Sequence, residues 1–220
     1  MRFRKLAVGN LVRVDGMEAI RRRGYWFRRG LLNVTQVSAL AAEVTAICER
    51  RGWLVGRRGF GWGEPEFAQL QVEVQMLPGF AELREDPQLL ECAERLLGKP
   101  PRAQQGDVCR VLFPQAPEFT TPPHQDQYFF TRADEFWAAW IPLAECRRRQ
   151  GSLAVVSGSR QGGVLPHKDS VCALPSGHSR WREFDFRAGD VLFVHSLTVH
   201  KSLANRSGGV RISIDCRYAA

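Results

Sequence analysis

The chain has 220 residues, of which 44% are hydrophobic and 25% are charged, a composition typical of a folded domain and not of an extensively disordered chain. Its 31 Lys and Arg residues outnumber its 23 Asp and Glu residues, giving a net charge of +8, but no helix or aromatic platform groups them, which argues against nucleic acid as a partner. The apolar run at the start is broken by Asn10 and Arg13, which excludes a signal core or a membrane span in this stretch.

The first hundred residues carry the helical patterns. After Asn33, apolar side chains recur with a period of 3.6 residues, which predicts a helix with Thr35 as its cap and Gly52 as its end. A second helix is predicted to start at Pro87, next to a capping aspartate, and to stop at Gly98. Both helices are interpreted as scaffold.

The second half of the chain carries the strand patterns. Short β-branched and aromatic runs divided by Gly, Pro and Asp predict a sandwich or barrel. Two glycine-rich segments without a usable period, 55–67 and 157–182, are predicted to be loops, the first over a cleft and the second at the barrel mouth. We expect one domain over residues 1–220, with its helical part mainly in 19–100 and its β part mainly in 105–218.

The tripeptide H-x-D occurs twice, at His124 to Asp126 and at His167 to Asp169. Side chains at positions i and i+2 of a strand point to the same side, so His124 and Asp126 can both face a barrel interior while Gln125 faces away. The second copy has no flanking strand and is interpreted as a solvated loop. The first copy is therefore the candidate metal site.

A further ligand must come from elsewhere in the chain. His195 and His200 both lie in the segment "DVLFVHSLTVHKS". Two histidines and one carboxylate suit non-haem Fe(II), because three coordination positions remain open. His195 sits inside an apolar strand, where a histidine is more often packed and hydrogen-bonded than a ligand.

The segment "VRISIDCRY" provides a basic group beside this site. Strand alternation places Arg211, Ser213, Asp215 and Arg217 on one face. An unpaired buried charge costs about 3–5 kcal/mol, so Arg211 inside a barrel would need an anionic partner such as a dicarboxylic acid. Arg217 is a rival for this role, but its place near the chain end favours a surface or inter-element salt bridge.

Together the H-x-D, the distal histidine in "VHKS" followed by Asn205, and the arginine eleven positions after that histidine resemble the phytanoyl-CoA dioxygenase family of Fe(II)- and 2-oxoglutarate-dependent oxygenases. The resemblance covers about residues 19 to 217 and includes "AIRRRGYWFRRGLL", "CAERLLG", "GSLAVVSGSR" and "RAGDVLFVHSLTVHKSLAN". It implies a mainly β fold with flanking helices, in which the core is a double-stranded β-helix (a cupin-like jelly roll).

The resemblance also implies roles for individual residues. The implied metal ligands are His124, Asp126 and His200. The implied 2-oxoglutarate contacts are Arg211 at the distal carboxylate, with Ser202 and Trp140 lining the pocket. Arg160 stands where the family has histidine, and Lys201 where it usually has glycine. The expected cofactors are Fe(II), 2-oxoglutarate as cosubstrate and O2.

From this resemblance we expect hydroxylation of a C–H bond in a small-molecule metabolite, with succinate and CO2 as co-products. Related halogenases lack the carboxylate, so Asp126 favours oxygenation. Epimerisation, desaturation or cyclisation by the same chemistry stay open, as does a non-oxidative cupin-like isomerase or binding protein. Loops 55–67, 127–135 and 157–182 would form the substrate pocket.

Several expectations concern partners and location. Arg57, Arg58 and Arg160 are interpreted as surface residues that can meet an anionic or carrier-bound substrate, and no role is assigned to His167 or His178. The six cysteines form no C-x-x-C pair, which favours a reduced, cytoplasmic protein. We expect no membrane contact, and a monomer or weak homo-oligomer.

Overall fold

The computed structural model describes residues 14–55, 59–130, 134–174 and 180–220. The helices are α1 (Val14–Arg23), α2 (Val34–Arg50), α3 (Pro65–Gln75), α4 (Pro78–Arg84), α5 (Pro87–Leu97) and α6 (Asp126–Phe129). The strands are β1 (Tyr25–Arg28), β2 (Arg102–Ala103), β3 (Val108–Leu112), β4 (Trp137–Pro142), β5 (Leu153–Val156), β6 (His167–Lys168), β7 (Val171–Cys172), β8 (Trp181–Glu183), β9 (Val191–His195), β10 (His200–Ser202) and β11 (Arg211–Ala219). Among the described residues, no helix is both long and apolar enough to cross a membrane.

The two predicted helices form, and one of the two predicted caps is wrong. In α5 the Asp86 side chain accepts hydrogen bonds from two backbone N–H groups of the first turn, Pro87 follows it, and Gly98 ends the helix with φ of 76°. Only glycine adopts this left-handed conformation at little cost. In α2 the cap is Asn33, which accepts from the N–H of Thr35 over 2.8 Å, so the helix begins two residues earlier than Thr35 as a cap would place it.

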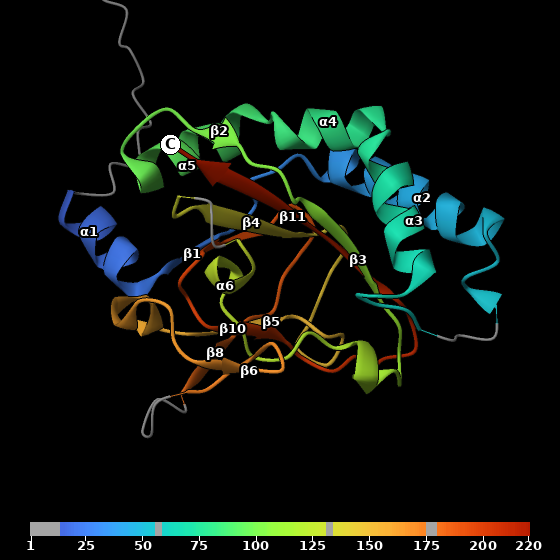
Figure 1. Cartoon of the computed structure of the whole chain (residues 1–220). Coiled ribbons are helices and arrows are strands. Elements are labelled where there is room, and N and C mark those ends of the chain that lie inside the picture. The colour runs from blue at the N-terminus through green and yellow to red at the C-terminus, as the bar shows by residue number, and fades with distance from the viewer. Residues whose placement is uncertain (1–13, 56–58, 131–133, 175–179) are drawn as a thin grey trace, which may run out of the picture.

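The strands form the two facing sheets of a double-stranded β-helix, as the resemblance implies. The larger sheet has the order β1-β9-β4-β11-β2, with β3 also paired to β11, and the smaller has the order β10-β5-β8. All these pairings are antiparallel. Figure 1 shows the smaller sheet across from the larger one, with helices α2 to α5 beyond the larger sheet.

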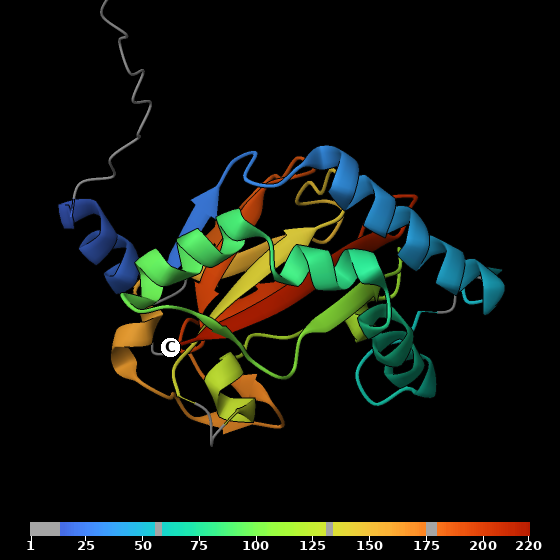
Figure 2. The same cartoon turned by 90° about the horizontal axis from the view of Figure 1, so that it is seen from above.

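Strand β4 explains why the larger sheet is buried on both faces. Its alternate residues Trp137, Ala139 and Ile141 pack in one core with helices α2 to α5. The intervening Trp140 packs in a second core with Leu192 and side chains of the smaller sheet. Figure 2 shows helices α2 (blue), α4 and α5 (green) lying across the outer face of the sheet. The inner face is therefore the one that can line a site.

Both segments that were predicted to be loops contain regular structure. In 157–182 there is a 3-10 turn at Ser159–Gly162, a hairpin of β6 and β7, and strand β8. In 55–67, helix α3 begins at Pro65, and Phe60 and Phe67 are buried. Turn and hairpin residues carry no period of 2 or 3.6 over a useful length, so the pattern could not identify them. The N-terminal segment 1–13 lies outside the described residues.

Candidate metal centre

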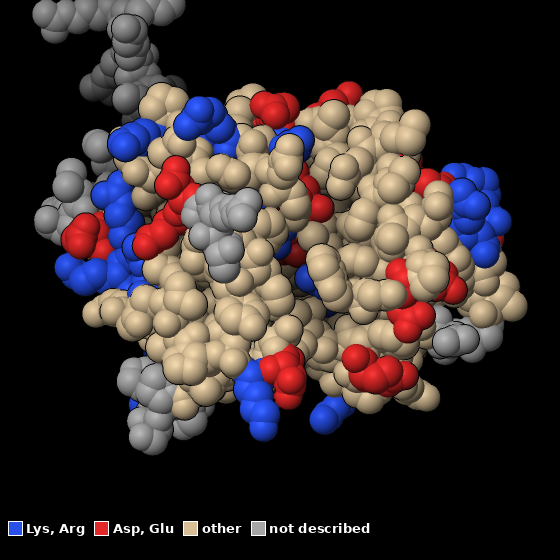
Figure 3. All heavy atoms as spheres, in the orientation of Figure 1, with Lys and Arg blue, Asp and Glu red and all other residues tan. Residues whose placement is uncertain are grey.

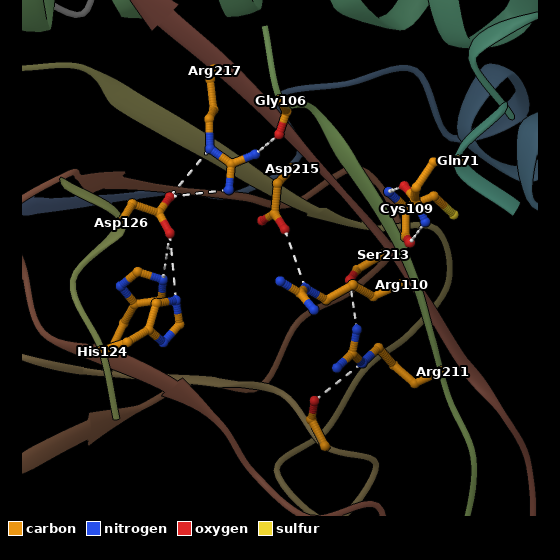
Figure 4. Close-up of polar contacts among 12 residues, drawn as sticks. Gln71, Gly106, Cys109, Arg110, His124, Asp126, Arg211, Ser213, Asp215 and Arg217 are labelled. Carbon is orange, nitrogen blue, oxygen red and sulfur yellow. Dashed lines mark hydrogen bonds and ion pairs between the residues drawn. The ribbon is translucent and has the colours of Figure 1, made fainter. Parts of the chain in front are cut away.

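Three side chains meet at the inner face of the smaller sheet. His124 and His200 form an isolated antiparallel bridge, each backbone N–H donating to the other residue's carbonyl over 3.0 Å. Asp126 is the first residue of α6, so the prediction that it shares one strand with His124 is wrong. Because Gln125 is still extended, with φ of −116° and ψ of 129°, the side chains on either side of it reach the same point (Figure 4).

The distances within this cluster suit a single small ion. Asp126 Oδ1 lies 3.4 Å from His124 Nε2 and 3.7 Å from His200 Nε2. One ligand atom from each of the three residues lies within 4.8 Å of the others, and all three residues are buried. Among the described residues this is the one group of three or more His, Cys, Asp and Glu side chains close enough to share a metal ion.

The protonation of the cluster also suits a cation. Nδ1 of His124 lies 2.8 Å from the Pro122 carbonyl, and Nδ1 of His200 lies 2.9 Å from the Thr198 carbonyl. A carbonyl only accepts hydrogen bonds, so each Nδ1 carries a proton and each ring turns its Nε2 to the cluster. Burial lowers the pKa of His200 to about 4, which keeps its imidazole neutral.

The carboxylate is ionised as well. Burial by itself would raise the pKa of Asp126, but the positive charge of Arg217 holds this pKa well below its ordinary value. Two imidazoles and one carboxylate are the donor set that non-haem Fe(II) uses, so the residues fit that metal.

Gln125 points away from the cluster, as predicted, and it is fully buried. Its Nε2 donates to the carbonyls of Gly163 and Leu197 over 2.8 and 2.6 Å, and its Oε1 accepts from the N–H of Leu165 over 2.7 Å. The residue between the two candidate ligands therefore fastens them to two other segments of the chain.

The second H-x-D does not join the metal cluster. The His167 ring stacks on Tyr128 with 4.0 Å between ring centroids, and its Nε2 accepts from the N–H of Gln125 over 3.3 Å. The interpretation of His167 as a solvated loop residue is therefore wrong, because it packs against the first H-x-D. Asp169 is exposed and has a positive φ of 49°.

A cavity of about 390 Å³ opens beside the cluster. Besides the three clustered residues, its lining includes Arg110, Trp140, Ser202 and Asp215. A second cavity of about 270 Å³ shares Arg110 and Ser202 with the first and adds Arg211 together with aromatic side chains such as Phe60.

Arg211 is buried at the edge of this second cavity. Its Nε donates to the carbonyl of Gly151 over 3.1 Å, and its Nη1 donates to Ser213 Oγ over 2.5 Å. Its guanidinium carbon lies 5.6 Å from the centre of the Trp140 ring. The structure thus brings Arg211, Ser202 and Trp140 to the walls of two adjoining cavities.

Sequence reasoning missed two arginines at the site. Arg217 is buried and contacts Asp126 with its guanidinium. Of the two predicted alternatives, the surface salt bridge is therefore wrong, and the salt bridge between two elements is the one that Arg217 makes. Arg110 lines both cavities, 3.8 Å from Asp215. Strand alternation carried a signal for both: Arg217 shares the Arg211 face, and Arg110 interrupts the apolar run "VCRVLF".

His195 and Arg160 line neither of the two cavities. The His195 ring packs on Trp137, and burial lowers its pKa to about 3. Arg160 donates to the carbonyl of Arg21 over 2.9 Å and lies 3.5 Å from Glu135, so it ties α1 to the barrel. The remaining candidates 57, 58 and 178 lie outside the described residues.

The surface seen in Figure 3 carries basic and acidic groups interspersed around its edge. Charged atoms of both signs lie in a hollow near the middle of this face. On this face the positive charge is therefore dispersed and does not form a continuous patch.

Comparison with known proteins identifies a family and several relatives. A family model described as phytanoyl-CoA dioxygenase matches residues 20–213. The 1-deoxypentalenic acid 11-beta-hydroxylase of Streptomyces arenae is 31% identical over 63% of this chain and 56% of that protein. A probable phytanoyl-CoA dioxygenase of Caenorhabditis elegans is 24% identical over 96% of this chain and 76% of that protein. The match thus spans little more than half of the Streptomyces hydroxylase.

Two solved structures from nogalamycin biosynthesis have a similar fold. One is the epimerase SnoN in complex with Fe3+, alpha ketoglutarate and nogalamycin RO, with a TM-score of 0.68 and 23% identity over 92% of this chain and 81% of that chain. The other is the alpha ketoglutarate dependent carbocyclase SnoK, with a TM-score of 0.70 and 24% identity over 94% of this chain and 84% of that chain.

Proposed function

The chain belongs to the phytanoyl-CoA dioxygenase family of Fe(II)- and 2-oxoglutarate-dependent oxygenases, and from this membership we propose that it hydroxylates a C–H bond of a small-molecule metabolite, with succinate and CO2 as co-products. The observation that carries the proposal is the buried cluster of two histidine Nε2 atoms and one ionised carboxylate. The name of the Streptomyces hydroxylase supports this choice of reaction.

The proposed ligands, His124, Asp126 and His200, would hold the iron. Bound iron and 2-oxoglutarate supply the oxidising chemistry, in which O2 is consumed as the keto acid loses CO2. The protein orients the reactants and keeps bulk water from them, since the ligand residues are 5–8% exposed. The carboxylate of Asp126 supports oxygenation over halogenation, because related halogenases lack it.

We assign the distal carboxylate of 2-oxoglutarate to Arg211. Its Nε and Nη1 are engaged, while its Nη2 makes no hydrogen bond with any described residue and is free for a ligand carboxylate. Ser202 lines both cavities, so a dicarboxylate extending from the metal cluster toward Arg211 would pass it. Trp140 supports the guanidinium from one side.

The charges at the site support an anionic substrate. Three arginines and two aspartates line the two cavities: Arg110, Arg211, Arg217, Asp126 and Asp215. Their sum is one positive charge, and a metal dication cancels the two charges of 2-oxoglutarate. A monoanionic substrate would neutralise the rest. Arg110 is the group to receive it, because its guanidinium makes no hydrogen bond with any described residue and its nearest acidic oxygen is 3.8 Å away.

Reactions other than hydroxylation are compatible with the same proposed ligands. The epimerase and the carbocyclase share this fold, so epimerisation, cyclisation and desaturation are alternatives that depend on where the substrate lies. A non-oxidative cupin-like isomerase or binding protein is the alternative from another class. It would bind metal without consuming 2-oxoglutarate.

The test is turnover of the cosubstrate. The iron-loaded protein with 2-oxoglutarate should give a visible charge-transfer band without oxygen and succinate with oxygen. His124→Ala and Asp126→Ala should lose both signals, whereas His167→Ala, which alters the second H-x-D, should keep them. Absence of both signals in the wild type would contradict oxygenase function, and an equal loss in His167→Ala would overturn the ligand assignment.

A further inference from the structure

Arg217 is a buried cation whose nitrogens are all engaged. Its Nε and Nη2 donate to one and the same oxygen, Asp126 Oδ2, over 3.3 and 3.2 Å (Figure 4). Its Nη1 donates to the carbonyl of Gly106, and its backbone N–H donates to Asp107 Oδ1 over 2.8 Å. The ring of Phe130 lies 5.0 Å from the guanidinium carbon. These contacts confine the guanidinium to one position.

The two oxygens of Asp126 consequently face different neighbours. Oδ1 faces the histidine pair, 3.4 Å from His124 Nε2 and 3.7 Å from His200 Nε2. Oδ2 is turned away from the pair and is covered by two N–H groups of Arg217. One oxygen is thus placed for a metal, and the other is already bound by the protein.

We propose that Arg217 is a positioning residue that restricts Asp126 to monodentate coordination and so keeps one metal position open for O2. The inference rests on the proposed function. A metal of this class has six positions. In the holo protein the two histidines and Oδ1 would take three, and the keto acid end of 2-oxoglutarate would take two, which would leave one. A bidentate Asp126 would occupy the last position.

The contacts of Arg217 make the bidentate state unfavourable. To coordinate through Oδ2, Asp126 would have to give up two charge-assisted hydrogen bonds and leave a buried guanidinium without its acid. The guanidinium cannot easily follow, because β11 and the Gly106 to Asp107 segment hold it. Arg84 in α4 in turn holds Asp107, with 2.9 Å between Arg84 Nε and Asp107 Oδ2.

Matched variants separate this role from a general structural one. Arg217→Met removes the cover from Oδ2 while keeping an apolar chain of similar reach. Arg217→Lys restores a single cationic donor. Arg84→Met serves as the control, because it removes an ion pair from the same network without touching Asp126.

The first measurement needs no cosubstrate. Crystal structures of the Co(II)-loaded proteins should show Asp126 bound through Oδ1 alone in the wild type and in Arg84→Met. In Arg217→Met both oxygens should lie at bonding distance, about 2.0–2.2 Å from the metal. Monodentate binding in Arg217→Met, or bidentate binding in the wild type, would overturn the proposal.

The second measurement reports on the open position. Nitric oxide, added without oxygen to the protein with Fe(II) and 2-oxoglutarate, should give an S = 3/2 electron paramagnetic resonance signal in the wild type and in Arg84→Met. The signal should be lost in Arg217→Met and partly restored in Arg217→Lys, and an undiminished signal in Arg217→Met would contradict the inference. If the wild type shows the expected Co(II) geometry but no charge-transfer band with 2-oxoglutarate, the proposed function fails while the role of Arg217 stands.

Discussion

Replacing Gln125 with alanine should destabilise the protein by about 3 kcal/mol. The side chain makes three buried hydrogen bonds, two from Nε2 to the carbonyls of Gly163 and Leu197 and one from the N–H of Leu165 to Oε1. A hydrogen bond of this kind contributes about 1 kcal/mol, and the partners left behind are buried groups whose desolvation is no longer offset. For a chain of this length, 3 kcal/mol corresponds to a fall in Tm of about 6–12 °C.

The assay is urea unfolding followed by tryptophan fluorescence, with Gln125→Leu and Gln88→Ala alongside. Leucine keeps most of the volume but none of the hydrogen bonds, so a similar loss in Gln125→Leu would assign the effect to the polar contacts. Gln88 is exposed on α5, and its replacement should change the free energy of unfolding by less than about 0.5 kcal/mol. If Gln125→Ala matched this control, Gln125 would not brace the metal cluster.

Three further outcomes follow from the structure. Arg211→Met should weaken 2-oxoglutarate binding by about 10- to 100-fold in a titration of the charge-transfer band, because charge-assisted hydrogen bonds contribute about 1.5–3 kcal/mol. Unchanged affinity would refute the assignment of the distal carboxylate to Arg211. The six buried cysteines should react slowly with an aromatic disulfide reagent at pH 8 in the native protein and completely in guanidinium. The reason is that burial raises the pKa of Cys48 and of Cys146 to about 11, which suppresses the reactive thiolate. Rapid labelling of the native protein would contradict this prediction. Gly151→Ala should lower the free energy of unfolding, measured by urea denaturation, by more than about 1 kcal/mol. Gly151 has φ of 85°, and a Cβ added there would lie 2.4 Å from a methyl group of Leu112. The control Gly208→Ala should have little effect, because nothing lies within 4 Å of a Cβ at that position.

Local signals were sufficient for much of the scaffold. The cap, proline and glycine of α5 lie within a dozen residues of one another, and their preferences are properties of the backbone itself. The alternation in β11 likewise predicted which of its residues face the interior, since Arg211 and Asp215 line cavities while Ile214 packs under the helices. Where the pattern was weaker, as at Thr35, the predicted start of α2 was two residues too late.

The residues proposed as ligands could also be singled out from the sequence, because H-x-D, a distal histidine and an arginine eleven positions after that histidine match the pattern of the family that the chain resembles. In the structure, the backbone bridge from His124 to His200 distinguishes the two H-x-D copies, because it brings the first copy beside a histidine 76 residues away. The sequence by itself therefore determined helices α2 and α5, the alternation of β11 and the candidate ligands. Only the tertiary structure decided that Arg217 lies against Asp126, 91 residues away, and that Arg110 opens into both cavities. The physical reason is that a buried charge takes its partner from whichever segment the sheets bring beside it, and no local pattern records that choice.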